Sequence, residues 1–131
     1  MNEKRGILIV DDEAIILLAI RQELRLRLGT EYVYETALNA ESGLDVLRAL
    51  KEKGVRIAVI ISDLLMPGMR GDEFLRIARA ECPDAKLVIM SGHADDEQME
   101  KIAVEIQLFA SLSKPYYNNA LAEIVKSALS A

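Results

Sequence analysis

Three carboxylates follow apolar segments of this chain at points where a buried strand would end. The run "GILIV" at 6–10 leads directly to Asp11 and Asp12, and the run "RIAVII" at 56–61 leads through one serine to Asp63. A carboxylate in such a place is costly in free energy unless a charge or a hydrogen-bond partner uses it. These three side chains are therefore candidates for a shared site.

Other polar residues follow the remaining apolar runs. Ser91 comes directly after "KLVIM" at 86–90, and Ser113 and Lys114 come after "LFASL" at 108–112. The ammonium group of Lys114 is the one cation in this set, and it would face the carboxylates if the segments end at the same edge.

Three carboxylates brought together repel one another by roughly 4 kcal/mol per close pair at an effective dielectric constant near 20, so they need a cation. Oxygen ligands suit Mg²⁺. The single cysteine, Cys82, and the single histidine, His93, cannot form the cluster that zinc prefers. We expect a magnesium site.

Magnesium and Lys114 together would neutralise an incoming phosphoryl group, and phosphoryl transfer depends mainly on positioning and charge stabilisation. A carboxylate can act as the nucleophile and form an acyl phosphate. Asp63 is the candidate for that role.

The elements that must position these residues follow from the spacing of apolar side chains. Short apolar runs predict strands at 6–10, 32–37, 56–61, 86–90 and 108–112. Apolar residues at helical spacing predict helices through Ile16, Ile20, Leu24 and Leu28; Leu44, Leu47 and Leu50; Phe74, Ile77 and Ala78; Met99, Ile102, Ala103 and Ile106; and Leu121, Ile124, Val125 and Ala128.

Several residues mark the ends of these helices. Gly29 is a C-cap for the first helix and Asn39 is an N-cap for the second. The segment "CPD" at 82–84 ends the third, because proline disfavours helical geometry in the preceding residue. Asp95 or Asp96 can cap the fourth.

Strand and helix alternate five times, and this order predicts an α/β fold with a five-stranded parallel sheet covered by helices on both faces. Ligands of such sheets bind outside the carboxyl ends of the strands. The polar residues described above all follow strands, so the fold would gather them at that edge.

Length and composition restrict the class of protein. A chain of 131 residues with 51% hydrophobic residues fits one domain over 1–131, with a core over about 5–129 and no output domain. No apolar run is long enough to cross a membrane, and we expect a soluble, cytoplasmic protein. A net charge of −5 argues against direct nucleic-acid binding.

The segments "ILIVDDE", "ISDLLMPGMRG", "VIMSGH" and "LSKPY" resemble, in order and spacing, the motifs of the response-regulator receiver domain of two-component signalling. The resemblance spans nearly the whole chain. It implies a CheY-like, flavodoxin-like (βα)5 doubly wound fold. It also implies a signalling module with only slow self-phosphorylation and self-dephosphorylation, rather than an enzyme.

The resemblance also implies roles for single residues. Asp63 matches the aspartate that takes a phosphoryl group from a sensor histidine kinase or a histidine phosphotransfer protein. Asp11 and Asp12 match the pair that holds Mg²⁺, to which Leu65 would add its backbone carbonyl. The remaining matches are Ser91, whose hydroxyl binds the phosphoryl oxygen, Lys114, which contacts that oxygen, and Pro115, which follows a cis peptide bond in this family.

The chain departs from the family pattern at Ser111, where many receivers carry an aromatic residue that turns inward on activation. Phe109 lies two residues earlier and is predicted to share a strand face with Ser111. Leu65 and His93 stand at positions that tune dephosphorylation in receivers. We hypothesise that the apolar Leu65 hinders an attacking water.

Simpler interpretations remain for each residue. Asp12 could cap the first helix, Lys114 could be a solvated surface charge, and Ser91 could be a turn residue. A lone histidine such as His93 is usually neither ligand nor base.

Two alternative functions stay open. One is a receiver-like scaffold that binds a partner without phosphorylation. The other is a Mg²⁺-dependent aspartyl-phosphate hydrolase, which would need Asp-x-Asp where positions 11–13 read Asp-Asp-Glu. Residues 95–130 are the candidate surface for a downstream partner, an output domain or a second copy of the chain.

Overall fold

The computed structural model describes residues 3–92, 97–114 and 120–131. Its strands are β1 (Arg5–Val10), β2 (Val33–Ala37), β3 (Arg56–Asp63), β4 (Lys86–Ser91) and β5 (Ala110–Ser113). Its helices are α1 (Ala14–Leu28), α2 (Ala40–Glu52), α3 (Gly71–Glu81), α4 (Glu97–Ile106) and α5 (Ala120–Ser130).

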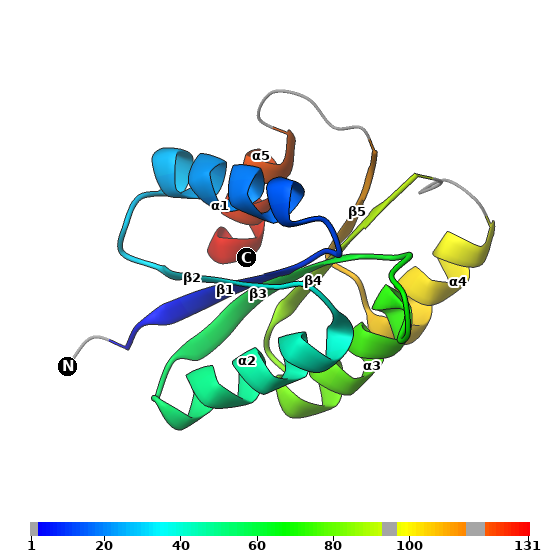
Figure 1. Cartoon of the computed structure of the whole chain (residues 1–131), viewed down its shortest axis with the longest axis horizontal. Coiled ribbons are helices and arrows are strands. Elements are labelled where there is room, and N and C mark those ends of the chain that lie inside the picture. The colour runs from blue at the N-terminus through cyan, green and yellow to red at the C-terminus, as the bar shows by residue number, and fades with distance from the viewer. Residues whose placement is uncertain (1–2, 93–96, 115–119) are drawn as a thin grey trace.

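The five strands form one sheet in the order β2-β1-β3-β4-β5, and all four pairings are parallel. Helices α1 and α5 cover one face of the sheet, and α2, α3 and α4 cover the other (Figure 1). This arrangement confirms the predicted α/β fold. It also brings the carboxyl ends of β1, β3, β4 and β5 to a single edge.

Each face of the sheet contributes to its own apolar core. Alternate residues of β3 point to opposite sides, so Ile60 packs with α2, α3 and α4 whereas Ile61 packs with α1 and α5. Both side chains are fully buried. Burial on both faces explains why the strands read as continuous apolar runs in the sequence.

The predicted helix ends agree closely with the structure. Gly29 caps α1 with φ 99°, a left-handed conformation that glycine adopts at little cost. The side chain of Asn39 accepts a hydrogen bond from the amide of Ser42 at 2.8 Å, as an N-cap does. Cys82 directly follows α3 and precedes the turn into β4.

Some predictions differ from the structure in detail, and others lie outside the described residues. The last strand begins at Ala110, so Phe109 lies one residue before it, although its amide already donates to the carbonyl of Leu87 in β4. Ile77 of α3 is 36% exposed, and Leu75 takes its place in the core. The predictions for His93, Asp95, Asp96 and Pro115 fall on residues that the structure does not describe.

Within the described ranges, no helix has both the length and the apolar character needed to cross a membrane.

Candidate functional site

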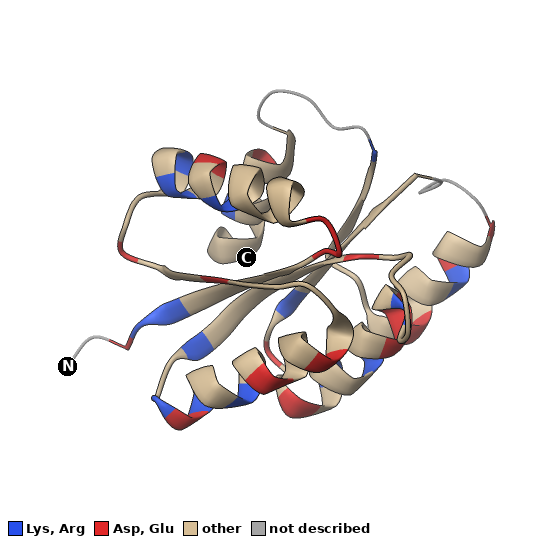
Figure 2. Ribbon diagram, viewed as in Figure 1, with Lys and Arg blue, Asp and Glu red and all other residues tan. Residues whose placement is uncertain are grey.

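The three predicted carboxylates lie together at the carboxyl edge of the sheet. Asp11 follows β1 and Asp63 is the last residue of β3, and these two strands are neighbours. Figure 2 shows the acidic ends of β1 and β3 meeting at this edge. One carboxylate oxygen from each of Asp11, Asp12 and Asp63 lies within 4.8 Å of the others. Asp11 is fully buried and Asp63 nearly so, whereas Asp12 is exposed.

Asp11 is fixed by hydrogen bonds at both its main chain and its side chain. Its amide donates to the carbonyl of Ala37 at 3.2 Å, and its Oδ1 accepts the amide of Glu13 at 2.9 Å. Glu13 is the N-cap residue of α1. Asp12 is therefore not the cap of this helix, and its carboxylate is left to face the cluster and solvent.

Lys114 supplies the positive charge of the site. Its Nζ lies 3.2 Å from Oδ2 of Asp11 and 3.2 Å from Oδ2 of Asp63, and its side chain is 25% exposed. The main-chain amide of Lys114 donates to the carbonyl of Ser91 at 2.7 Å. This bond carries the β4–β5 pairing one residue beyond the strand and sets where the lysine side chain begins.

Charge and burial shift the titration of two of these groups. Burial raises the pKa of Asp63, and the neighbouring carboxylate of Asp11 adds to the rise, while Lys114 opposes it. Burial alone would lower the pKa of Lys114, but the carboxylates of Asp11 and Asp63 outweigh it and the net shift is upward. Lys114 is thus held as an ammonium, and the Asp63 charge is only partly compensated.

Ser91 and Leu65 lie at the same edge of the sheet, at the end of β4 and after the end of β3. Ser91 is the last residue of β4 and is 3% exposed. Leu65 lies two residues beyond Asp63 in the loop to α3, and its side chain is 59% exposed. The amide of Leu64 donates to the carbonyl of Met90 at 2.9 Å, which ties the start of this loop to β4.

The residues present fit a divalent cation. Three carboxylates with oxygens this close, one of them fully buried, form an all-oxygen donor set with a formal charge of −3 before Lys114 is counted. Hard cations such as Mg²⁺ prefer such ligands. The triad is able to hold a metal ion, and Asp12 is the member open to solvent.

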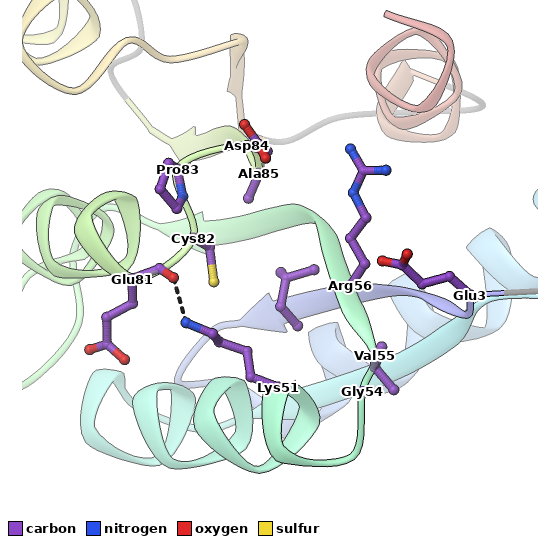
Figure 3. A pocket seen from close by; sticks show the side chains of 11 residues that line it. Glu3, Lys51, Gly54, Val55, Arg56, Glu81, Cys82, Pro83, Asp84 and Ala85 are labelled. Carbon is purple, nitrogen blue, oxygen red and sulfur yellow. Dashed lines mark hydrogen bonds between the residues drawn. The ribbon is translucent and has the colours of Figure 1, made fainter.

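A separate hollow of about 310 Å³ lies at the amino edge of the sheet, away from the carboxylates. Figure 3 shows Cys82 beside Lys51 there, and Lys51 Nζ donates to the main-chain carbonyl of Glu81 at 2.6 Å. Arg56 and Glu3 also line it. None of the predicted site residues lies in this hollow.

Two contributors to the site escaped the sequence interpretation. The amide of Glu13 holds Asp11, and Gly71 lies against the main chain of Asp63. A glycine at the start of a helix, in "MRGDEF", was the available signal for the second. No residue type marks the first, because it acts through the main chain.

Comparison with known proteins gives a consistent result. The family model described as "Response regulator receiver domain" matches residues 7–126. The chain is 32% identical to the sensor kinase CckA of Brucella abortus over 94% of its own length and 12% of that protein. It is 29% identical to the transcriptional regulatory protein FixJ of Bradyrhizobium diazoefficiens over 98% of its own length and 58% of that protein.

A solved structure of a response regulator receiver domain protein from Clostridium thermocellum superposes with a TM-score of 0.79 at 28% identity, covering 96% of this chain and 94% of that one. The chain spans only about an eighth to just over half of the curated relatives named above. With the order of strands and the acidic cluster beside Lys114, the match over residues 7–126 shows that the chain belongs to the response regulator receiver domain family.

Proposed function

We propose that this receiver domain is a phosphorylation switch in which Asp63 accepts a phosphoryl group from the phosphohistidine of a sensor histidine kinase or a histidine phosphotransfer protein. The observation that supports it most is the position of the Asp63 carboxylate, which is nearly buried, lies 3.2 Å from Lys114 Nζ and has an oxygen within 4.8 Å of oxygens of Asp11 and Asp12. A structural carboxylate would not need two further carboxylates beside it.

In the transfer step, a carboxylate oxygen of Asp63 forms a bond to phosphorus as the bond between phosphorus and the donor nitrogen breaks. The imidazole of the donor leaves and later takes a proton from solvent, and Asp63 becomes an acyl phosphate. Bound Mg²⁺ supplies charge neutralisation for the phosphoryl oxygens. Lys114, which directly follows β5 at the same edge of the sheet, supplies a second positive charge.

Asp11, Asp12 and Asp63 would hold the ion, with the backbone carbonyl of Leu65 as a further candidate ligand. The buried Asp11 is fixed by Glu13, so it is a preorganised ligand. The exposed Asp12 can bind directly or through a water. Ser91, at the end of β4, is the proposed hydroxyl donor to the phosphoryl oxygen.

The proposed output is a change in partner binding on the side of α4, β5 and α5. Of these elements, β5 adjoins Ser91 through the β4–β5 pairing, and Lys114 directly follows β5. The partner is a downstream protein, an output domain or a second copy of the chain. Ser111 is exposed on β5 and brings no aromatic ring to the switch, so Ser91 and Lys114 are the groups that would transmit the change.

The test is phosphorylation by a small-molecule donor. The protein is incubated with Mg²⁺ and acetyl phosphate, its intact mass is recorded, and the experiment is repeated with Asp63→Ala and with Mg²⁺ chelated. We expect one added phosphoryl group that both controls abolish.

No adduct, together with no Mg²⁺-dependent binding of beryllofluoride, would contradict the proposal. That pair of results would favour a receiver-like scaffold that binds partners without phosphorylation. An adduct that persists in Asp63→Ala would move the phosphoacceptor to another residue.

A further inference from the structure

Gly71, the first residue of α3, is in close contact with the main chain of Asp63. Its amide donates to the carbonyl of Leu64 at 2.8 Å, which closes the loop from β3 to α3 on itself. A methyl group at Gly71 would overlap the carbonyl oxygen of Asp63. It would also stand 2.9 Å from the carbonyl carbon of Asp63 and from Cα of Leu64.

The main chain of Asp63 has little freedom to move away from such a methyl group. Asp63 is paired with Met90 in the sheet, and its carbonyl oxygen accepts a hydrogen bond from Oγ of Ser62 at 2.9 Å. The next amide, that of Leu64, donates to the carbonyl of Met90. A side chain at Gly71 must therefore displace either the end of β3 or the start of α3.

Glycine is needed at this position for space and not for backbone conformation. Gly68, in the same loop, has φ 81° and an open surrounding, so it serves the turn. Among the described residues, Gly71 is not one of the glycines that have a positive φ. The feature that distinguishes Gly71 is its contact with the residue that carries the candidate phosphoacceptor.

We propose that Gly71 is a positioning residue for the site: the missing Cβ lets α3 begin directly against Asp63 and so fixes the Asp63 carboxylate beside Asp11 and Asp12. This inference rests on the proposed function for its biological meaning, but its physical content is a metal-binding geometry. Groups that orient the ligands of a metal typically change its affinity 10- to 100-fold when they are altered.

The test is divalent-cation binding by Gly71→Ala, with Mn²⁺ as the probe because it takes the same oxygen ligands and its free concentration is read by electron paramagnetic resonance. We expect Gly71→Ala to bind Mn²⁺ about tenfold more weakly than the unmodified protein. The Mg²⁺ concentration for half-maximal phosphorylation by acetyl phosphate should rise by a similar factor.

Gly43→Ala is the matched control for a crowded glycine that does not contact the main chain of Asp63. Gly43 lies in the first turn of α2, and a methyl group there would stand 3.1 Å from the Phe74 ring and from a methyl group of Val10. These neighbours are side-chain atoms that can shift. We expect Gly43→Ala to lower the free energy of unfolding in urea while its Mn²⁺ affinity stays within twofold of the unmodified protein.

A double-mutant cycle separates positioning from general damage to the fold. If Gly71 acts through Asp63, Gly71→Ala should cost no further Mn²⁺ affinity in an Asp63→Asn background. An equal loss in both backgrounds, or no loss in either, would overturn the proposal. If Gly71→Ala does not fold, Ser62→Ala replaces it, since it removes the hydrogen bond to the same carbonyl oxygen, and unchanged Mn²⁺ affinity would then overturn it.

The two proposals fail in different ways. If the unmodified protein binds Mn²⁺ but gains no phosphoryl group, the proposed function fails and the comparison of Mn²⁺ affinities still decides the role of Gly71. If the unmodified protein is phosphorylated and Gly71→Ala binds Mn²⁺ normally, only the inference about Gly71 fails.

Discussion

The ammonium of Lys114 lies 3.2 Å from Oδ2 of Asp11, a carboxylate with no solvent exposure. Removing one partner of a buried pair leaves the other charge uncompensated. We expect Lys114→Met to lower the free energy of unfolding by about 2 kcal/mol without divalent cations, measured by urea denaturation in EDTA. Saturating Mg²⁺ should recover most of that loss, because it supplies the missing charge.

Lys101→Met is the control for losing a lysine as such, since Lys101 is exposed on α4. It should change the free energy of unfolding by less than about 0.5 kcal/mol in either condition. A Lys114→Met loss that Mg²⁺ does not reduce would show that the lysine is needed for packing and not for charge.

Asp63→Asn should make the protein more stable in the absence of divalent cations. Burial and the carboxylate of Asp11 raise the pKa of Asp63 in the folded state, so folding favours its protonated form. A carboxyl group whose pKa is raised by folding contributes stability that is fully present below its unfolded-state pKa of about 3.9. That contribution is lost as pH rises through the folded-state pKa. The side-chain amide of an asparagine does not titrate in this pH range, so Asp63→Asn does not lose stability in this way.

The advantage of Asp63→Asn over the unmodified protein should therefore be small near pH 4 and larger at pH 7. Urea denaturation in EDTA across this range measures it, and Mg²⁺ at pH 7 should reduce it. An advantage of the same size at both pH values would mean that the substitution acts through packing and not through the charge.

Leu65→Asn tests whether an exposed apolar side chain protects the phosphoryl group. Leu65 lies two residues beyond Asp63 and is 59% exposed, so it can cover the site without being part of the core. A carboxamide at this position could orient an attacking water. We expect the phosphorylated protein to decay several-fold faster, followed by loss of the phosphorylated mass after acetyl phosphate is removed.

Leu26→Asn is the matched control, since Leu26 is 80% exposed in the last turn of α1, at the other end of the helix from Asp12. Its phosphoryl lifetime should equal that of the unmodified protein. Equal decay rates for Leu65→Asn and the unmodified protein would refute the hypothesis that Leu65 hinders an attacking water.

The sequence predicted most of the fold because the local signals agreed with the tertiary structure. The strands are covered on both faces and appear as short apolar runs, and the cap at Asn39 uses its own side chain. Asp63 was predicted to lie at the carboxyl edge for a topological reason, since parallel strands end together. The same reasoning placed Lys114 opposite it.

The remaining features depend on contacts between distant residues. The position of Ile77 at 36% exposure depends on how α3 rotates against its neighbours, and helical spacing alone could not distinguish it from Leu75. The start of β5 at Ala110, one residue after Phe109, depends on its register with β4. The contact of Gly71 with Asp63 likewise depends on the folded path of the loop between β3 and α3, which the sequence pattern does not give.

Cys82 should react slowly with thiol reagents. It is 8% exposed at the end of α3, and burial raises the pKa of its thiol, so the reactive thiolate is scarce at neutral pH. We expect iodoacetamide to label it on the order of 100-fold more slowly in the folded protein than in urea, because labelling needs local opening. The rate should rise through pH 9 without a plateau.

Mass spectrometry of the alkylated protein measures this rate. Labelling as fast in the folded protein as in urea would show that the hollow beside Lys51 admits reagents freely. A plateau below pH 8 would instead mean that the thiol pKa is lowered.

Arg79 joins two helices and a loop at the amino edge of the sheet. Its guanidinium donates to four main-chain carbonyls, those of Pro83 at 2.9 Å, Ala85 at 2.8 Å, Ile106 at 3.2 Å and Gln107 at 3.0 Å. The last two are at the end of α4, where carbonyls lack helical partners and a cation is favoured. Gln107 has φ 54°, the left-handed conformation typical of a helix end.

Arg79→Met keeps the length of the side chain and removes every one of these donors. We expect it to lower the free energy of unfolding by about 2 to 3 kcal/mol, since hydrogen bonds to a charged group are worth about 1.5 to 3 kcal/mol and part-buried carbonyls lose their partner. Arg79→Lys should recover little of this stability, because one ammonium group cannot reach all the carbonyls that are arranged around the planar guanidinium. Urea denaturation measures both variants.

Arg76→Met is the matched control from the same helix. Arg76 lies 2.6 Å from Glu105 of α4, but both side chains are at least half exposed, so the pair should contribute less than about 1 kcal/mol. If Arg79 fixes the end of α4, hydrogen exchange should quicken at the amides of 103–108 in Arg79→Met and not in Arg76→Met. Equal exchange in the two variants would show that the end of α4 is held by its apolar contacts, with Ile106 buried in the core, and not by the guanidinium.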